Sequence, residues 1–402
     1  MPRFEPFAAI RYAPGVDLDS VVCPPYDVIG PEERAALVAR SPHNAVQVEL
    51  PADDPDSGRD RFSEAAHLME TWRSEGVLRA DAEPVFYVCR MSFHDESGRP
   101  RSTTGVLGAL ELATPGQGDV LPHERTMPKP KGERLNLQRA CRANLSPVWG
   151  LSMAAGLSQI IAPEGRPAGE PLGRTVDNDG VEHELWRLPT ALAAEVEASV
   201  AGSPVVLADG HHRYETGLAY QSERRQATGG PGDYDLILAY VVELSADQLS
   251  VRAIHRLLSG LPAGFDLLGA LSSHFELEEA GPVDPSLLTT MEQRGLAVVT
   301  PEGAWVARPL LATSEAAESD LDSARLDVAL ADLPAHELTY QHGIENVMAA
   351  VDKGEAQAGV LLRPATVEVI ESTARARRRM PPKTTFFYPK PKTGLVFRPV
   401  VD

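Results

Sequence analysis

The residues best suited to chemistry lie in one short run, Val206-Leu-Ala-Asp209-Gly210-His211-His212-Arg213-Tyr214. An apolar strand over 205–207 precedes a loop over 209–213, in which Gly210 permits a tight turn because glycine tolerates a positive φ. A helix is expected over 214–225, and free backbone N–H groups and the dipole at a helix N-terminus favour anions. The two histidines and Arg213 add donors for phosphate oxygens. The run therefore predicts a phosphate-binding site that includes Gly210, His212 and Arg213.

Asp209 and His211 are the candidates for chemistry within this run. Their side chains are predicted to hold Mg²⁺ or to accept a proton from a substrate. The alternative is structural: Asp209 caps the helix, and both histidines are partly exposed. The offsets of aspartate, glycine and arginine favour the functional interpretation.

A second group of polar side chains follows residue 122. It begins with the pair His123 and Glu124 and continues with cations and a hydroxyl group: Arg125, Thr126, Lys129, Lys131, Arg134, Arg139 and Arg142. Such a density of cations in an acidic protein predicts a loop that closes over a polyphosphate. The alternative is a solvated basic helix face, which is the usual role of a charge run.

A third group lies near the C-terminus, where Lys383 and Lys390 flank an aromatic segment. These lysines are predicted to contribute phosphate contacts, although an exposed strand end explains them equally well. The Walker A, GxGxxG, His-Glu-x-x-His and Gly-x-Ser-x-Gly motifs are absent from the sequence. The standard P-loop ATPase, Rossmann dehydrogenase, zincin and α/β-hydrolase interpretations therefore lose their main support.

The elements that position these groups are read from periodicity and turn residues. Apolar positions over 61–76 recur with a helical period, and 84–93 with 102–112 predict a β-hairpin around Asp95-Glu-Ser-Gly98. The mixed order of helices and strands predicts an α/β (α+β mixed) fold. We expect a main domain over 1–262 and a smaller C-terminal lobe over 263–402, whose last strand returns to the main domain.

Composition limits the function classes. The 402 residues are 43% hydrophobic and 24% charged, which is typical of a globular protein, and the formal net charge is -19. That charge argues against nucleic acid or an anionic membrane as the partner. No run approaches the roughly 20 apolar residues of a membrane-spanning helix, and the N-terminus lacks the pattern of a signal peptide. A cytoplasmic location is therefore expected, and the oligomeric state stays open.

Taken together, several blocks resemble the domain-of-unknown-function 1015 family, in order and over nearly the whole chain. The blocks are Val22-x-Pro24-Pro25-Tyr26-Asp27-Val28-Ile29, His123-Glu124-Arg125-Thr126, Lys129-Pro-Lys131, Arg142-Ala-Asn144-Leu-Ser-Pro147, Ala208-Asp-Gly-His-His-Arg-Tyr-Glu-Thr216, His255-Arg256 and Lys383-x-Thr385-x-x-Tyr388-Pro-Lys390. The Asp-Gly-His-His-Arg block also resembles the phosphate-contacting motif of the ParB/sulfiredoxin-like superfamily, which includes a nucleotide-dependent kinase of free serine. One departure is Gly217, where the family usually has alanine.

The resemblance implies a ParB/sulfiredoxin-like core with additional N-terminal segments, in which residues 209–213 contact nucleotide phosphates. It points to a kinase-like phosphotransferase that uses ATP or ADP, with Mg²⁺, on a small hydroxylated metabolite such as free serine. The catalytic carboxylate is Asp27 or Glu124, and the two stay open. A phosphatase or nucleotide hydrolase on the same anion site, or a regulator that senses a nucleotide or phosphometabolite without chemistry, are the alternatives.

Overall fold

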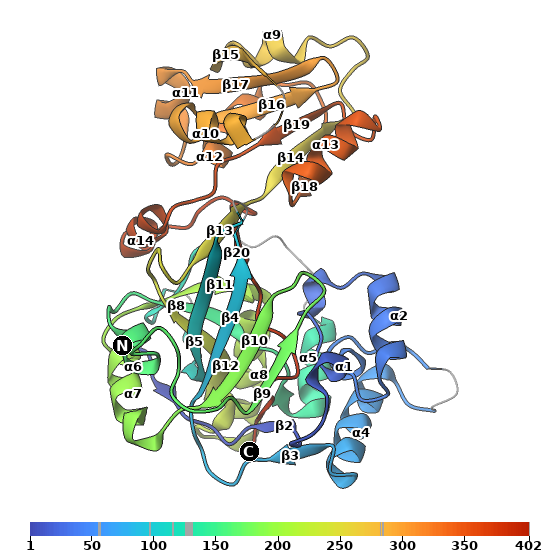
Figure 1. The fold of residues 1–402 in the computed structure, drawn as a ribbon, viewed down its shortest axis with the longest axis vertical. Helices are drawn as coiled ribbons and strands as arrows, with labels where there is room; N and C mark the ends of the chain where they lie inside the picture. The colour runs from blue at the N-terminus through green and yellow to red at the C-terminus, as the bar shows by residue number, and fades with distance from the viewer. Residues whose placement is uncertain are drawn as a thin grey trace. The chain divides into compact units, whose positions relative to one another are not determined.

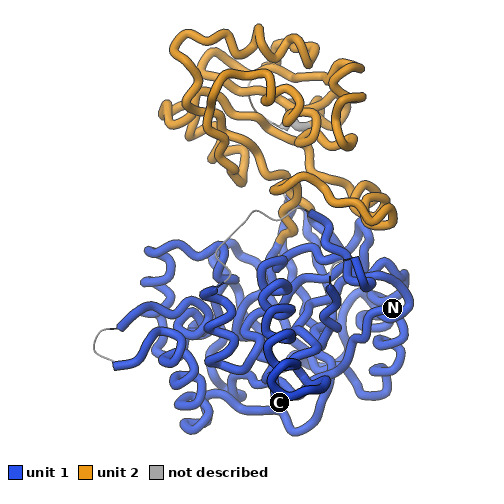
Figure 2. The backbone as a smooth tube through the Cα atoms, turned by 180° about the vertical axis from the view of Figure 1, so that it is seen from behind, with its two compact units in different colours: residues 1–250, 389–402 blue, residues 251–388 orange. Residues whose placement is uncertain are grey.

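The computed structural model describes residues 1–54, 58–95, 98–114, 116–124, 132–281, 283 and 285–401. These residues form two compact units, Met1–Ser250 with Pro389–Asp402, and Val251–Tyr388 (Figure 2). The division thus falls after residue 250, whereas the sequence pattern placed it after 262. The final segment belongs to the first unit.

The first unit is organised by a large mixed sheet (Figure 1). Its path runs β6-β11-β8-β12-β5-β4-β10-β9, and β1 pairs with β5. The strands are β1 (Phe4–Glu5), β4 (Tyr87–His94), β5 (Pro100–Glu111), β6 (Val120–Pro122), β8 (Val148–Ser152), β9 (Gly173–Val176), β10 (Glu182–Arg187), β11 (Val205–Asp209) and β12 (Leu236–Glu243). The antiparallel pairing of β4 with β5 confirms the predicted hairpin. The mixed α/β class predicted from the sequence is therefore correct.

Helices and short strand pairs complete the first unit. The helices are α1 (Leu18–Val21), α2 (Pro31–Arg40), α3 (Val46–Glu49), α4 (Arg61–Ser74), α5 (Gly132–Cys141), α6 (Leu157–Ile161), α7 (Ala193–Ala201) and α8 (His211–Thr228), with 3-10 turns η1 (Tyr26–Val28), η2 (Thr190–Leu192) and η3 (Asp233–Asp235). The short pairs are β2 (Ile10–Tyr12) with β3 (Leu78–Ala80), and β7 (Ala143–Asn144) with β21 (Arg398–Pro399). The helical period over 61–76 corresponds to α4, whose N-terminus is capped by the carboxylate of Asp60.

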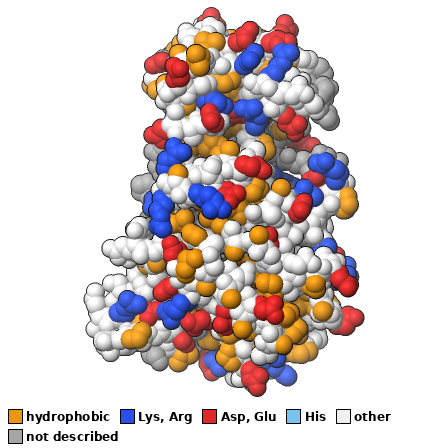
Figure 3. Space-filling model, turned by 90° about the vertical axis from the view of Figure 1, so that its left-hand side faces the viewer, with side chains coloured by type: hydrophobic (Ala, Val, Ile, Leu, Met, Phe, Trp, Pro, Cys, Tyr) orange, Lys and Arg blue, Asp and Glu red, His pale blue; other side chains and the backbone are white. Residues whose placement is uncertain are grey.

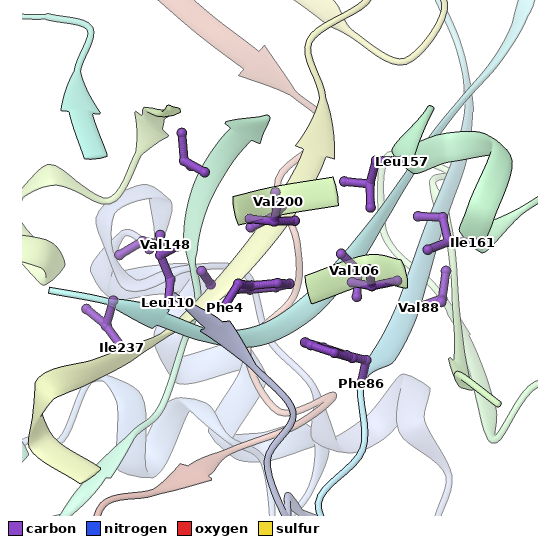
Figure 4. Close-up of a cluster of buried hydrophobic side chains, with 14 of the residues drawn as sticks. Phe4, Phe86, Val88, Val106, Leu110, Val148, Leu157, Ile161, Val200 and Ile237 are labelled. Atoms are coloured by element: carbon purple, nitrogen blue, oxygen red, sulfur yellow. The ribbon is translucent and has the colours of Figure 1, made fainter. Parts of the chain in front are cut away.

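One hydrophobic core lies between the large sheet and the helices α6 and α7 (Figure 4). Leu157 and Ile161 of α6 and Val200 of α7 pack with sheet side chains such as Val106. A second core joins the N-terminal strands to α4 and α5, with Trp72 and Leu137 among its buried members. The N-terminal segments are therefore packed structure that belongs to the first unit.

Gly217 lies where α8 comes close to the sheet. A Cβ at this position would lie 3.2 Å from side-chain carbons of Leu112 and Ile237. That separation is tighter than ordinary van der Waals contact. The glycine that departs from the family pattern therefore permits close packing of the helix on the sheet.

The second unit contains a six-stranded sheet with the order β15-β17-β16-β19-β14-β18. Successive residues such as Val298 and Val299 belong to different hydrophobic clusters, so both faces of this sheet are covered. Its strands are β14 (His255–Ser259), β15 (Phe275–Ala280), β16 (Leu296–Thr300), β17 (Gly303–Pro309), β18 (Glu337–Gln341) and β19 (Ala358–Leu361), and β13 (Ser250–Ala253) pairs separately with β20 (Thr385–Tyr388). The helices are α9 (Leu267–Leu271), α10 (Pro285–Arg294), α11 (Leu311–Ala316), α12 (Asp322–Ala331), α13 (Ile344–Asp352) and α14 (Val367–Arg375).

The surface carries charges of both signs. On the face drawn in Figure 3, acidic and basic side chains are interspersed among neutral ones. Within the described parts of the chain, no helix is both long enough and apolar enough to cross a bilayer.

His255, which opens β14, makes the second unit sensitive to acid. Its Nδ1 accepts the Leu362 N–H at 3.1 Å, and burial, with a smaller contribution from Arg256, lowers the pKa of His255 to about 4. The unfolded chain takes up this proton near pH 6.5, so stability is complete above that pH and falls as the pH drops towards 4. We expect a loss of up to about 3 kcal/mol in the unfolding free energy of this unit.

The test is hydrogen exchange of the β14 and β19 amides at pH 7 and pH 4.5, corrected for the intrinsic exchange rate. His255→Asn keeps an acceptor for the Leu362 N–H but does not titrate. Its amides should lose less protection at pH 4.5 than those of the wild type. Equal losses in the two proteins would show that His255 is not the acid-sensitive group.

Candidate functional site

The candidate site is built on the junction of β11 and α8 (Figure 1). β11 is buried from Val205 to Ala208, and its last residue, Asp209, is half-buried. Gly210 then turns the chain with φ 85°. The N–H of Tyr214 donates to the carbonyl oxygen of Gly210 at 2.9 Å, which closes the first helical turn. The helix therefore begins at His211, three residues before the predicted start at 214. A single glycine makes the turn, so both histidines lie in the first turn of α8.

Sheet order brings two other segments to this junction. β6 runs parallel to β11, with Pro122 opposite Leu207, so the residues after β6 emerge beside those after β11. β8 runs antiparallel to β11 and begins at Val148, so Pro147 lies at the same edge. The carboxyl ends of parallel strands are the usual place for a ligand in such sheets.

Lys390 links two carboxylates at this edge. Its ammonium nitrogen lies 2.8 Å from Oδ1 of Asp209 and 3.0 Å from Oδ2 of Asp27. The C-terminal segment reaches this place because Cys23 and Thr393 exchange backbone hydrogen bonds, which sets residues 389–393 against the Asp27 loop. Burial by itself lowers the pKa of Lys390, but the two carboxylates outweigh burial and raise that pKa above its ordinary value. Lys390 is therefore a charged lysine held between two acids.

Arg213 occupies the other side of Asp209. Its Nη2 donates to Oδ2 of Asp209 at 2.6 Å, and its Nη1 donates to the carbonyl oxygen of Pro147. Burial alone raises the pKa of Asp209, but Lys390 and Arg213 outweigh it and hold that pKa below its ordinary value. Arg213 is thus buried and positions Asp209, and its predicted contact with phosphate stays a prediction.

His123 and Glu124 lie beside the first turn of α8. The Nδ1–H of His123 donates to the carbonyl oxygen of Leu207 at 2.6 Å, and its ring centroid lies 5.1 Å from that of His211. A carboxylate oxygen of Glu124 lies 3.6 Å from Nε2 of His123. The histidine pair therefore connects Glu124 to the N-terminus of α8.

The remaining predicted residues fall into three groups. Arg125, Thr126, Lys129 and Lys131 lie outside the described residues, so their contribution stays a prediction. Lys383 belongs to the second unit, where its carbonyl oxygen accepts a hydrogen bond from Arg256. His212 lies in the first turn of α8, one residue beyond His211.

The predicted Mg²⁺ site at Asp209 and His211 does not fit the side chains around it. Oδ1 of Asp209 is bound by Lys390 and Oδ2 by Arg213, so both oxygens already face cations. Mg²⁺ prefers several oxygen ligands, and His211 offers only nitrogen. Among the described residues, no group of three or more histidine, cysteine, aspartate or glutamate side chains is placed to hold a metal.

The buried Glu49, which supports the site through Arg134, was not predicted from the sequence. Glu49 is fully buried, and its Oε1 accepts hydrogen bonds from Arg134 at 2.9 Å and from Ser146 at 2.8 Å. The guanidinium of Arg134 in turn lies 4.0 Å from the ring centroid of Tyr26, next to Asp27. A glutamate within the apolar stretch 45–50 was the available signal, because a buried carboxylate requires a partner.

Gly210 offers a direct test of the junction. A Cβ at this position would lie 3.1 Å from Cα of Val148 and 3.1 Å from Nε of Arg213, at a φ that L residues rarely adopt. Gly229, at the other end of α8, has φ 74° and open space around it. We expect Gly210→Ala to lower the free energy of unfolding by about 1–3 kcal/mol more than Gly229→Ala does.

Urea unfolding of the two variants measures this difference. The penalty for positive φ is shared by both, so it cancels. Equal losses would mean that the close approach of Gly210 to β8 does not constrain the site.

The sequence matches a family model described as Protein of unknown function (DUF1015) over residues 4–329. No curated protein matches the sequence. A conserved hypothetical protein from Pyrococcus furiosus is 14% identical, with 69% of this chain and 92% of that chain covered and a TM-score of 0.36. A free serine kinase in complex with AMP is 16% identical, with coverages of 69% and 88% and a TM-score of 0.35. SbnI with a C-terminal truncation, from Staphylococcus aureus, is 11% identical, with coverages of 73% and 87% and a TM-score of 0.39. At these scores, none of the three likenesses establishes a shared fold or activity.

Proposed function

Since the chain belongs to the DUF1015 family of proteins of unknown function, we propose an activity from the geometry of its site: a nucleotide-dependent phosphotransferase that acts on a small hydroxylated molecule. Free serine is one acceptor of this class. The proposal requires a place for phosphates, a carboxylate for the acceptor hydroxyl and charge neutralisation between them. These are the components that phosphoryl transfer mainly uses.

The observation that carries the proposal is the position of Lys390 between Asp27 and Asp209, at the N-terminus of an 18-residue helix. Two carboxylates alone would repel a phosphate. Lys390 and Arg213 balance their charge, and the first N–H groups of α8 then supply an attractive field for an anion. His123 and His211 add ring nitrogens at the same end of the helix.

Asp27 is the better candidate of the two carboxylates left open by the sequence. Its side chain is 30% exposed, against 15% for Glu124, so an acceptor has more access to it. In the proposed step, the acceptor hydroxyl oxygen forms a bond to the terminal phosphorus of the nucleotide. The bond from that phosphorus to its bridging oxygen breaks, and its electron pair leaves with the shortened nucleotide. The hydroxyl proton passes to Asp27.

The test uses the full chain with ATP, ADP and a panel of hydroxylated acceptors that begins with free serine. Phosphorus NMR follows the fate of the terminal phosphoryl group. The proposal expects a new phosphate ester that appears only with an acceptor present. Release of inorganic phosphate alone would instead indicate a hydrolase. Absence of both turnover and nucleotide binding would reject the proposal.

A further inference from the structure

A cavity of about 350 Å³ lies between α4, α5 and the first turns of α8. Its walls include the side chains of Tyr26, Leu50, Phe62, Leu137 and His212. Tyr26, Leu50, Phe62 and Leu137 are apolar or aromatic, and the charged side chains of Arg61, Glu133 and Arg134 also line the cavity. Ligand cavities for small organic molecules have this size range and this kind of lining.

The cavity is adjacent to the proposed phosphate site but separate from the reacting groups. His212 lines it from the first turn of α8, and Tyr26 lines it next to Asp27. Asp27, Asp209 and Lys390 are not among the lining residues. An acceptor hydroxyl must reach a carboxylate, so a small acceptor confined to this cavity would not react. The non-reacting end of a long donor has no such requirement.

The wall at Tyr26 is supported by Arg134. Both terminal nitrogens of the Arg134 guanidinium donate to Glu49, Nη1 to its carbonyl oxygen at 2.5 Å and Nη2 to Oε1 at 2.9 Å. The same guanidinium lies 4.0 Å from the ring centroid of Tyr26. Glu49 is fully buried, so Arg134 is anchored on the core of the first unit and supports the Tyr26 ring from one side.

We infer that this cavity binds the base of the nucleotide that donates the phosphoryl group, with the phosphates directed to the N-terminus of α8. The inference rests on the proposed function and adds to it a subsite for the donor. A flat ring gains contact with Phe62, Leu137 and Tyr26, and stacking of bases on aromatic side chains tolerates different bases.

Calorimetric titration of the full chain with ATP and with tripolyphosphate separates the ring from the phosphates. We expect ATP to bind at least tenfold more tightly than tripolyphosphate. Phe62→Ala should weaken ATP about tenfold and leave tripolyphosphate unchanged. The control is Leu68→Ala, which removes a partly buried side chain from the same helix and the same core but does not line the cavity. It should leave both affinities unchanged.

Equal affinities for ATP and tripolyphosphate, or an equal effect of Phe62→Ala on both, would overturn the inference while leaving phosphate binding intact. If neither compound binds, the proposed function fails and the subsite fails with it. Photolabelling of the wild-type chain with 8-azido-ATP gives a readout that does not depend on the folding of a variant. The label should fall on peptides that contain residues 50, 62 or 137, and labelling elsewhere would contradict the inference.

Discussion

Asp27→Asn is expected to reduce the rate of phosphoryl transfer by about 10²–10⁴-fold, which is the usual contribution of a positioned proton acceptor. The amide keeps the size of the side chain but cannot take the hydroxyl proton. Folding should be retained, because Lys390 still pairs with Asp209 at 2.8 Å and Asp27 is the more exposed of its two partners. The measurement is kcat and KM for the nucleotide, with the loss confined mainly to kcat.

Glu124→Gln is the matched control for this prediction. It also converts one carboxylate to an amide at the same end of the sheet, but Glu124 contacts the α8 N-terminus through His123. We expect its loss of kcat to be much smaller. A larger loss for Glu124→Gln than for Asp27→Asn would reassign the proton acceptor to Glu124.

Asp209→Ala is expected to lower the free energy of unfolding by about 3–5 kcal/mol. The side chains of Lys390 and Arg213 are only 12% and 9% exposed, and Asp209 binds both. Removal of the shared carboxylate takes away the ion-pair partner of the largely buried Arg213 and leaves Lys390 paired with Asp27. Breaking a buried ion pair from one side is costly because the remaining charge loses its compensation. Chemical denaturation at neutral pH measures the effect.

Glu223→Ala provides the comparison on the same helix. Glu223 pairs with Arg139 at 2.5 Å, but their side chains are 42% and 46% exposed. Its removal should change stability by about 0–1 kcal/mol. A similar loss of unfolding free energy in the two variants would mean that burial of Asp209, Lys390 and Arg213 does not raise the cost of removing a carboxylate.

The pH dependence supplies a further check on Asp209. Its pKa is held below the ordinary value of 3.8, so its stabilising contribution is present above that pH and is lost as the pH falls through the lowered pKa. The difference in stability between the wild type and Asp209→Ala should therefore be constant near neutral pH. It should shrink only in strong acid.

Local features of this protein follow from the sequence. The apolar run before Asp209, the single turn residue Gly210 and the helical period over 61–76 each depend on neighbouring residues, so strand, turn and helix could be predicted. The start of α8 was placed three residues too late, because two consecutive histidines carry no helical signal of their own. The ParB/sulfiredoxin-like assignment, the location and the four cationic or hydroxyl residues at 125–131 stay predictions.

The pairing of the run 209–213 with its partners was decided by tertiary structure. Lys390 is 363 residues from Asp27 and 181 from Asp209, and no local pattern specifies contacts at such separations. Sheet order placed His123 beside α8. The backbone hydrogen bonds between Cys23 and Thr393 placed Lys390 beside Asp27. The inward direction of Arg213 also depends on the Pro147 carbonyl, which β8 brings to it. The sequence thus determined that residues 209–213 form a strand end and a helix start. The sheet order and register determined which charges meet there, because they set which distant segments share an edge.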